Sequence, residues 1–340
     1  MRTATHQRRV EYTAARVHAR HGRRMDAGPS AELVRLQSVS LLAHALHLSG
    51  DPKTSAHFQE ALEADLEGEL GQLARELGGV GGAFLEWLAT RRAVEALDVL
   101  LRDCCAAEEV PTPHEGNRAL EELAARLPEP IFRHALEKAV QQDPNHERPW
   151  PCFLELALER AYLVELAVRG RRLPAIETEV VLPMIRQEVD LFHLRLLLHA
   201  KAMPSGNGSW LREVHLNEGR ISRDEFEHLL GTEMKEWFEC RTLRGILGID
   251  ATTAAGLSGA NDAGHRAQIE RFAWRHYGLL ARRAWRRSHV GVGALAGYAV
   301  LRRLEMATWI AVSEGIRWGL DPGALGARMF SGPFREVLRA

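Results

Sequence analysis

Cysteine is scarce in this 340-residue chain, and its placement excludes two kinds of scaffold. The four cysteines are Cys104, Cys105, Cys152 and Cys240, and no two of them stand in a C-x-x-C spacing. A zinc-binding cysteine motif and a disulfide framework therefore both lack their residues. Such usage is typical of a reducing compartment, so we expect a cytoplasmic protein.

Long apolar runs are missing as well. No window reaches the ~18 uncharged apolar residues of a membrane span, because charged residues interrupt both of the most apolar segments. The first 25 residues carry charges throughout and lack the apolar centre of a signal peptide. We therefore expect any association with a membrane to be peripheral.

β-Branched residues are few, whereas Ala, Leu, Arg and Glu dominate, and this composition favours helix nearly everywhere. The sequence predicts an all-α protein without a β-sheet. Its length and its 46% of hydrophobic residues suffice for large cores. A net charge of -1 argues against a dedicated nucleic-acid binder.

Recognised cofactor and catalytic motifs are absent or lack their context. Residues 291–296 match the dinucleotide string G-x-G-x-x-[GA], but they follow a basic helical stretch and not a strand. We expect these small residues to let a helix start close to its neighbour. The 16 histidines include no H-E-x-x-H pair, and there is no G-x-S-x-G elbow. The sequence therefore predicts no cofactor, no metal and no catalytic residue.

What the chain does contain is a repeated segment. Residues 181–203 and 296–318 share one design at a shift of 115 residues: a basic and polar shoulder, one carboxylate (Asp190 or Glu305), then a nearly uninterrupted apolar run. A helix that is apolar on every side belongs in a core, so each carboxylate is expected to be buried beside a partner. A degraded copy at 84–105 has Ala93 in place of the acid.

The same shift superimposes further positions of the two copies. Together with the acids, the repeat positions are Glu155, Arg160, Tyr162 and Asp190 in one copy and Glu270, Arg275, Tyr277 and Glu305 in the other. We expect each arginine to lie beside the acid of its own copy, with the tyrosine nearby, since a buried acid needs a cation. The carboxylates could instead be acid–base catalysts, but recurrence in two copies is more typical of a structural device.

A repeat of this kind indicates stacked units. We expect three similar helical lobes, at residues 1–143, 144–247 and 248–340, the first of them divergent. The third lobe is rich in arginine, and Arg282, Arg283, Arg286 and Arg287 flank Trp285. These four arginines could bind a partner, whether nucleic acid, anionic lipid or an acidic protein, or could form a solvated helix face.

Several segments resemble the C-type stalk subunit of the V-type and A-type rotary ATPases, whose eukaryotic form is the d-type subunit. The resemblance is carried by Tyr12 to Ala19, by Glu155, Glu159, Arg160 and Tyr162, by Glu188 to Lys201, by Glu218 to Ile221, and by Tyr298, Glu305 and residues 313–320. It is good from about 153 to 329 and loose before. The family's asparagine after the acid is His193 in one copy and Thr308 in the other.

The resemblance implies a three-lobed, all-helical funnel of pseudo-threefold design that catalyses nothing. Such a subunit seats on the membrane rotor ring, receives the tip of the central shaft, and works at the cytoplasmic face of an ion-translocating ATPase. The resemblance implies no cofactor, nucleic acid or small-molecule substrate. Two alternatives stay open: a stand-alone helical-repeat scaffold without rotary partners, and a helical enzyme that uses the carboxylates.

Overall fold

The structure is a computed structural model that describes residues 9–19, 33, 35–36, 38–91, 94–95, 130–142, 150–202, 209–257 and 261–321. Within these ranges there is no β-strand, and the all-α prediction is confirmed. Residues 9–19 are helical. The other helices are α3 (Val39–Ala45), α4 (Ser55–Leu77), α5 (Gly79–Ala89), α8 (Pro130–Gln142), α9 (Trp150–Arg171), α10 (Ala175–Ala202), the 3-10 helix η1 (Ser209–Val214), α11 (Arg223–Gly231), α12 (Met234–Trp237), α13 (Arg241–Leu247), α14 (Ala251–Leu257), α15 (Asp262–Arg287) and α16 (Val292–Arg317).

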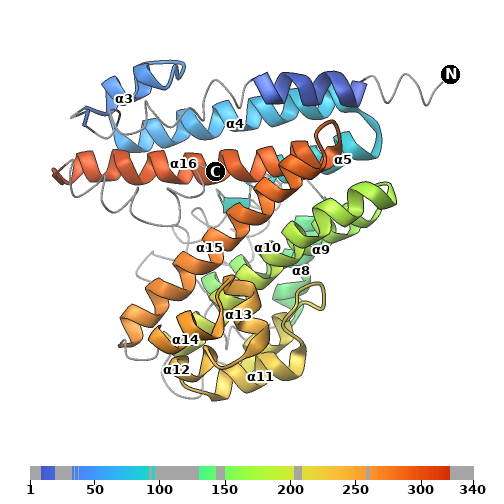
Figure 1. Ribbon diagram of the computed structural model, residues 1–340, viewed down its shortest axis with the longest axis vertical. Coiled ribbons are helices and arrows are strands. Elements are labelled where there is room, and N and C mark those ends of the chain that lie inside the picture. Colours follow the sequence, from blue (N-terminus) through green and yellow to red (C-terminus); the bar gives the residue numbers. More distant parts are fainter. Residues whose placement is uncertain are drawn as a thin grey trace.

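Three helical hairpins form the frame of the molecule: α4 with α5, α9 with α10, and α15 with α16 (Figure 1). The predicted shift of 115 residues carries α9 onto α15 and α10 onto α16 to within three residues at every end. The repeat read from the sequence is thus matched by the helix boundaries. The division into three lobes stays a prediction.

Short connections set where each hairpin reverses. Gly78 joins α4 to α5 with a positive φ of 63°, a conformation that glycine adopts without steric cost. The start of α4 is capped by Thr54, whose side chain accepts a hydrogen bond from the His57 amide at 3.2 Å. Asn261 caps α15 in the same way through the Gly264 amide at 2.8 Å.

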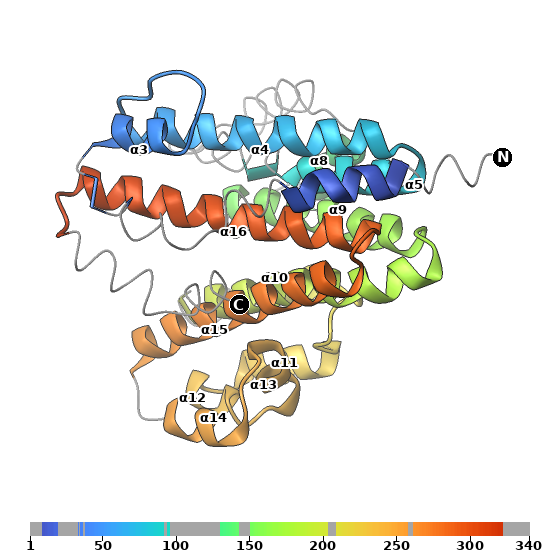
Figure 2. The ribbon, with the colours of Figure 1, turned by 45° about the horizontal axis from the view of Figure 1, so that its top comes forward.

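Helix α16 is the element that joins the hairpins. It packs on α15, α4, α10, α5 and α3, and both views show it between the first hairpin and α15 (Figure 2). Gly297 allows the close approach to α15, because a Cβ at this position would lie 2.5 Å from the Ala281 carbonyl oxygen. The small residues of α16 therefore have a packing role.

Two hydrophobic clusters stabilise this arrangement. The larger one runs through all three hairpins and the short helices that follow α10. The smaller one joins α3 and α4 to the last turns of α16 and contains Val39, Leu42, Phe58, Trp309 and Val312. Burial of this apolar surface is the main source of stability, since each buried aliphatic or aromatic side chain contributes roughly 1.5 to 3 kcal/mol.

The short helices α11 to α14 lie between the second and third hairpins in sequence and close one side of the molecule (Figure 1). A capping box starts α11, where Ser222 and Glu225 each bond the other's backbone amide. In the described part of the chain, every helix is too short or too polar to cross a membrane.

Candidate functional site

Equivalent positions of the three copies of the repeated segment lie together at the centre of the molecule. Counted from the repeated acid, the residue two places earlier is Glu188 on α10 and Arg303 on α16, and in the degraded copy it is Arg91, just after α5. The Arg303 Nη1 donates to Glu188 Oε1 at 3.0 Å. One charged position of each copy therefore contributes to a single buried polar network.

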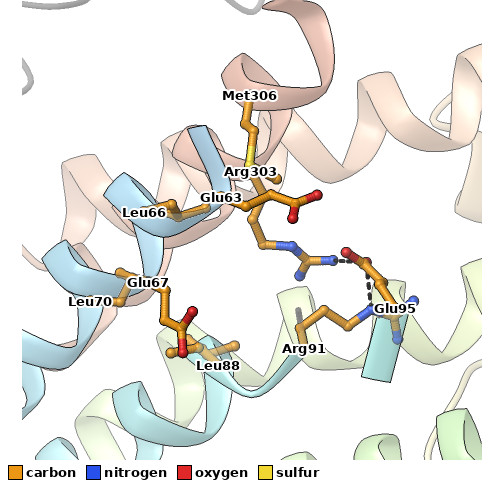
Figure 3. Close-up of a pocket in the computed structure, with 10 residues that line it drawn as sticks. Glu63, Leu66, Glu67, Leu70, Leu88, Arg91, Glu95, Arg303 and Met306 are labelled. Atoms are coloured by element: carbon orange, nitrogen blue, oxygen red, sulfur yellow. Dashed lines mark hydrogen bonds and ion pairs between the residues drawn. The ribbon is translucent and has the colours of Figure 1, made fainter. Parts of the chain in front are cut away.

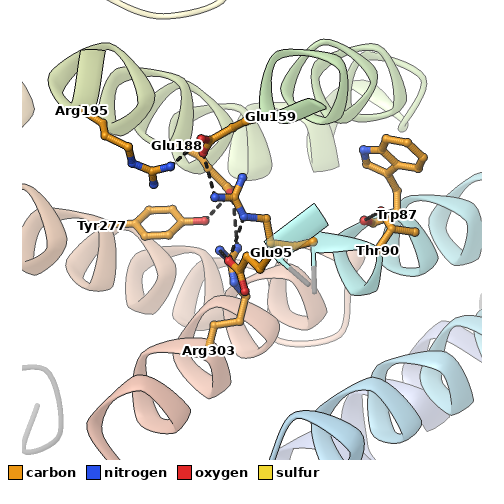
Figure 4. Close-up of polar contacts among 9 residues, drawn as sticks. Trp87, Thr90, Glu95, Glu159, Glu188, Arg195, Tyr277 and Arg303 are labelled. Atoms are coloured by element: carbon orange, nitrogen blue, oxygen red, sulfur yellow. Dashed lines mark hydrogen bonds and ion pairs between the residues drawn. The ribbon is translucent and has the colours of Figure 1, made fainter. Parts of the chain in front are cut away.

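Further side chains complete the network (Figure 4). The Arg91 Nη2 donates to Glu159 Oε1 on α9 at 2.8 Å, and its Nε donates to Glu95 Oε1 at 3.0 Å. Arg195 on α10 binds the other oxygen of Glu159. The Arg303 Nη2 also lies 3.9 Å from Glu95 Oε1. Three guanidinium groups thus face three carboxylates, and their formal charges cancel.

Burial makes this charge balance necessary. The side chains of Arg91, Glu159 and Glu188 are between 6% and 9% exposed. Burial alone would raise the pKa of Glu159, but the guanidinium groups of Arg91 and Arg195 outweigh it and hold that pKa below its usual value. Burial likewise opposes the charge on Arg91, and the carboxylates of Glu159, Glu95 and Glu188 raise its pKa instead. Both shifts favour the ionised forms of Glu159 and Arg91.

The two repeated tyrosines border the network. The Tyr277 hydroxyl donates to Glu188 Oε2 at 2.8 Å, and burial together with the negative charge of Glu188 raises its pKa well above 10. Tyr162 stacks on Trp87 at 5.8 Å between ring centroids and lies under the Arg91 guanidinium. Its buried hydroxyl has no hydrogen-bond partner among the described residues. Both tyrosines lie beside ionic groups, as expected, but not beside the predicted acids.

A small cavity opens above the network between α4, α5 and α16 (Figure 3). Its floor is formed by Arg91 and Arg303, and Glu63, Glu67 and Glu95 also line it. The cavity volume is about 20 Å³, which is room for about one water molecule. A substrate or cofactor does not fit this space.

The predicted pairing of Arg160 with Asp190 is wrong. Asp190 is fully buried, and its cation is Arg220, whose Nε donates to Asp190 Oδ2 at 2.6 Å. The backbone amide of Arg220 donates to Oδ1 at 2.7 Å. Burial raises the pKa of Asp190, and Arg220 partly offsets this. Arg160 instead lines a groove between α8 and α9, and within the described ranges its buried Nε has no hydrogen-bond partner.

The turn that carries Arg220 is held by two stacked histidines. His193 and His215 lie 4.4 Å apart between ring centroids with nearly parallel planes. The Leu216 amide donates to His193 Nε2 at 3.1 Å, so the ring is neutral with its proton on Nδ1. Gly219 fits against this pair, because a Cβ there would lie 2.7 Å from Asp190 Oδ1. His193, which stands where the family has asparagine, thus has a stacking partner in His215.

The predicted pairing of Arg275 with Glu305 is wrong as well. Glu305 is bound by Arg302 of its own helix. Arg302 also reaches α4, with its Nε 3.4 Å from Glu69 Oε2 and its Nη2 3.3 Å from Asp65 Oδ2. The Tyr298 hydroxyl donates to Glu69 Oε1 at 2.8 Å. Arg302 and Tyr298, and not Glu305, therefore join α16 to the first hairpin.

The remaining repeat positions have separate surroundings. Glu155 is half-buried on α9, whereas Glu270 is exposed on α15 and lines a groove with Arg195 and Arg266. Ala93 lies outside the described residues. The repeated acids and arginines are therefore not gathered in one pocket, as an acid–base catalytic site would require.

The arginine run of α15 divides into two kinds of residue. Arg283, Arg286 and Arg287 are exposed and could meet a partner. Arg282 is buried, and burial with the nearby charge of Arg286 lowers its pKa to about 10. Its prediction as a partner-binding residue is therefore wrong.

The glycines of the dinucleotide-like string have a structural explanation. Glu177 of α10 accepts the Gly293 amide at 2.8 Å and the Ser288 hydroxyl at 3.2 Å, so it caps the start of α16. A Cβ on Gly291 would lie 2.1 Å from Glu177 Oε1. The expectation that small residues let this helix start close to a neighbour is confirmed.

Sequence reasoning did not find the central network, although a signal for it was present. The register that aligned Asp190 with Glu305 also aligned Glu188 with Arg303, which carry opposite charges. Within the described ranges, no group of three or more His, Cys, Asp or Glu side chains could hold a metal. The network is a charge-balanced set of buried ion pairs suited to holding helices together.

A comparison with curated proteins finds no match. The family described as ATP synthase (C/AC39) subunit matches residues 13–328, which is most of the chain. This is the family that the repeated acid segments and the 313–320 segment resemble. The chain belongs to the ATP synthase (C/AC39) subunit family.

Proposed function

We propose that this protein is a non-catalytic adaptor that joins the central shaft of a V-type or A-type ion-translocating ATPase to the membrane rotor ring. In this proposal the three hairpins are the frames of three lobes around a common axis. The axis passes through the central network of Arg91, Glu188 and Arg303.

The observation that carries the proposal is the convergence of equivalent repeat positions on one charge-balanced cluster. A part that transmits torque must resist shear between its segments. Buried ion pairs between helices favour one relative placement of those helices over others. Family membership supports the same reading, because the matched family is that of an ATPase subunit.

Affinity capture from a native membrane extract, with identification of the retained proteins, tests the proposal. We expect shaft and ring proteins of a rotary ATPase to be retained at low salt. A parallel measurement of ATP binding by the isolated chain should show none. Capture of no rotary-ATPase protein at low salt would contradict the proposal and favour a stand-alone scaffold, whereas tight ATP binding would favour an enzyme.

A further inference from the structure

The turns of the three hairpins lie together at one end of the molecule. A Cβ on Gly81 of α5 would lie 2.9 Å from Val292 of α16, and one on Gly293 would lie 2.6 Å from Val180 of α10. Both ribbon views show the starts of α5, α10 and α16 on the same side (Figures 1 and 2). One surface is therefore built from three turns that are far apart in sequence.

Each of these turns exposes one large aliphatic side chain. The exposed fraction is 48% for Val80 at the start of α5, 75% for Ile176 at the start of α10, and 54% for Val290 just before α16. Single exposed aliphatic residues are ordinary on protein surfaces. Three of them at corresponding places of three hairpins, gathered at one end, are not explained by chance exposure.

Exposed arginines also end the helices that lead into these three turns. We define the tip face as the three aliphatic residues together with the exposed arginines at the ends of α4, α9 and α15: Val80, Ile176, Val290, Arg75, Arg171, Arg172, Arg286 and Arg287.

Three acids lie near the tip face in sequence or in contact: Glu177, Glu179 and Glu218. Glu177 caps α16, and Glu218 lies 3.5 Å from Arg171. Glu179 is exposed beside the second turn. The five arginines of the tip face outnumber these three acids, so the face has an excess of positive charge. Arginine in a last helical turn complements the helix dipole, which explains the arginines but not the aliphatic side chains between them.

We propose that the tip face binds an anionic phospholipid surface. Phosphate headgroups attract the arginines, and the aliphatic side chains enter the boundary between headgroups and acyl chains. The three tips project, and the three cavities whose linings are described lie elsewhere. A lipid surface can deform around the projecting turns of the tip face. A protein partner would instead need a surface whose hollows match those turns. This proposal does not depend on a role in a rotary ATPase.

Sedimentation of the full chain with lipid vesicles tests the proposal. One set of vesicles contains phosphatidylglycerol in phosphatidylcholine, and the other contains phosphatidylcholine alone. We expect sedimentation with the anionic vesicles only, and less of it as salt is added, because ions screen the exposed charges.

Two variants separate the contributions of the tip face. In Arg286→Ala/Arg287→Ala, each lost arginine is expected to lower the partition coefficient about fivefold, so the double variant should lose about 25-fold. The variant Val80→Ser/Ile176→Ser/Val290→Ser should lose at least about tenfold, because it removes the inserted apolar groups.

Matched controls change the same residue types elsewhere on the surface. Arg212→Ala/Arg241→Ala removes two exposed arginines, and Leu41→Ser/Trp318→Ser removes two exposed apolar side chains, all outside the tip face. Both controls should bind anionic vesicles as the unchanged chain does. Thermal denaturation of every variant checks that the fold is retained.

The alternatives give different results. Equal binding by tip and control variants would overturn the proposal, and so would the absence of binding to pure anionic vesicles. Binding only to membranes that carry a rotor ring would also overturn it, since the surface would then recognise protein. Vesicle binding without capture of rotary-ATPase proteins would leave this proposal standing and contradict the proposed function instead.

Discussion

Asp190 is the residue on which the short connection after η1 depends. It is fully buried, and it accepts the Arg220 side chain together with two backbone amides, those of Arg220 and Ile221. Asp190→Ala leaves those donors without an acceptor, so we expect the free energy of unfolding to fall by about 3 to 5 kcal/mol. Urea denaturation followed by circular dichroism measures the loss.

Two further variants sharpen this test. Asp190→Asn keeps an acceptor for the backbone amides and should be less destabilised than Asp190→Ala. Glu233→Ala removes an exposed acid that is paired with Lys235, and it should leave the unfolding midpoint unchanged. An Asp190→Ala protein as stable as the unchanged chain would refute the role given to this carboxylate.

The lowered pKa of His193 leads to a prediction of how the free energy of unfolding depends on pH. Burial, and secondarily the nearby His215, lowers its pKa from 6.5 to about 3. Between these values the unfolded chain binds a proton that the folded chain does not, so stability falls as the pH drops below about 6.5. The slope from one such group is at most ~1.4 kcal/mol per pH unit.

The variant His193→Asn isolates that contribution. Its side-chain oxygen can accept the Leu216 amide without titrating. Denaturation midpoints measured from about pH 7 down to about pH 5 should fall less steeply than those of the unchanged chain. Parallel curves for the two proteins would show that His193 is not buried as described.

At the scale of whole helices, the glycines of α16 set how closely it meets α15. Gly297→Ala puts a methyl group 2.5 Å from the Ala281 carbonyl oxygen, and this must push the helices apart. We expect a loss of about 1 to 3 kcal/mol, measured by urea denaturation. Gly68→Ala is the matched control, because a Cβ on this glycine of α4 meets nothing within 4 Å. It should gain about 0.5 to 1 kcal/mol through better helix propensity.

The helices themselves could be predicted from the sequence, but their ionic partners could not. Periodicity and the 115-residue register depend on local spacing, and the boundaries of α9, α10, α15 and α16 agree with them. The partner of Asp190 is in a turn 30 positions away, and the partners of Arg302 on α4 are more than 230 positions away. Such pairings follow from how hairpins cross, which a single sequence does not encode in its spacing.

At the scale of the whole molecule, the buried ion pair of Glu188 and Arg303 links two of the three hairpins. It joins the second hairpin to the third, and both side chains are largely buried. Glu188→Arg or Arg303→Glu alone places like charges together, and we expect each to cost about 3 to 5 kcal/mol. The exchanged double variant should recover part of this loss, since opposite charges again face each other.

A double-mutant cycle by urea denaturation measures the coupling. The exposed pair Arg223 and Glu227 serves as the control, because exchanging its charges should change stability by no more than about 0.5 kcal/mol. Strictly additive losses at Glu188 and Arg303 would mean that the two residues do not stabilise each other.

The position of α16 has a consequence for how the chain is made. During synthesis α4 leaves the ribosome well before α16, yet two groups that bind its buried acid, Glu69, come from α16. Tyr298 reaches Glu69 across 229 positions, and Arg302 across 233. Until those residues emerge, the contacts of Glu69 with Tyr298 and Arg302 cannot form, and the apolar side of α4 that α16 covers faces water. The first hairpin therefore stays without its α16 contacts through most of translation. During this time chaperones can bind it and proteases can cleave it.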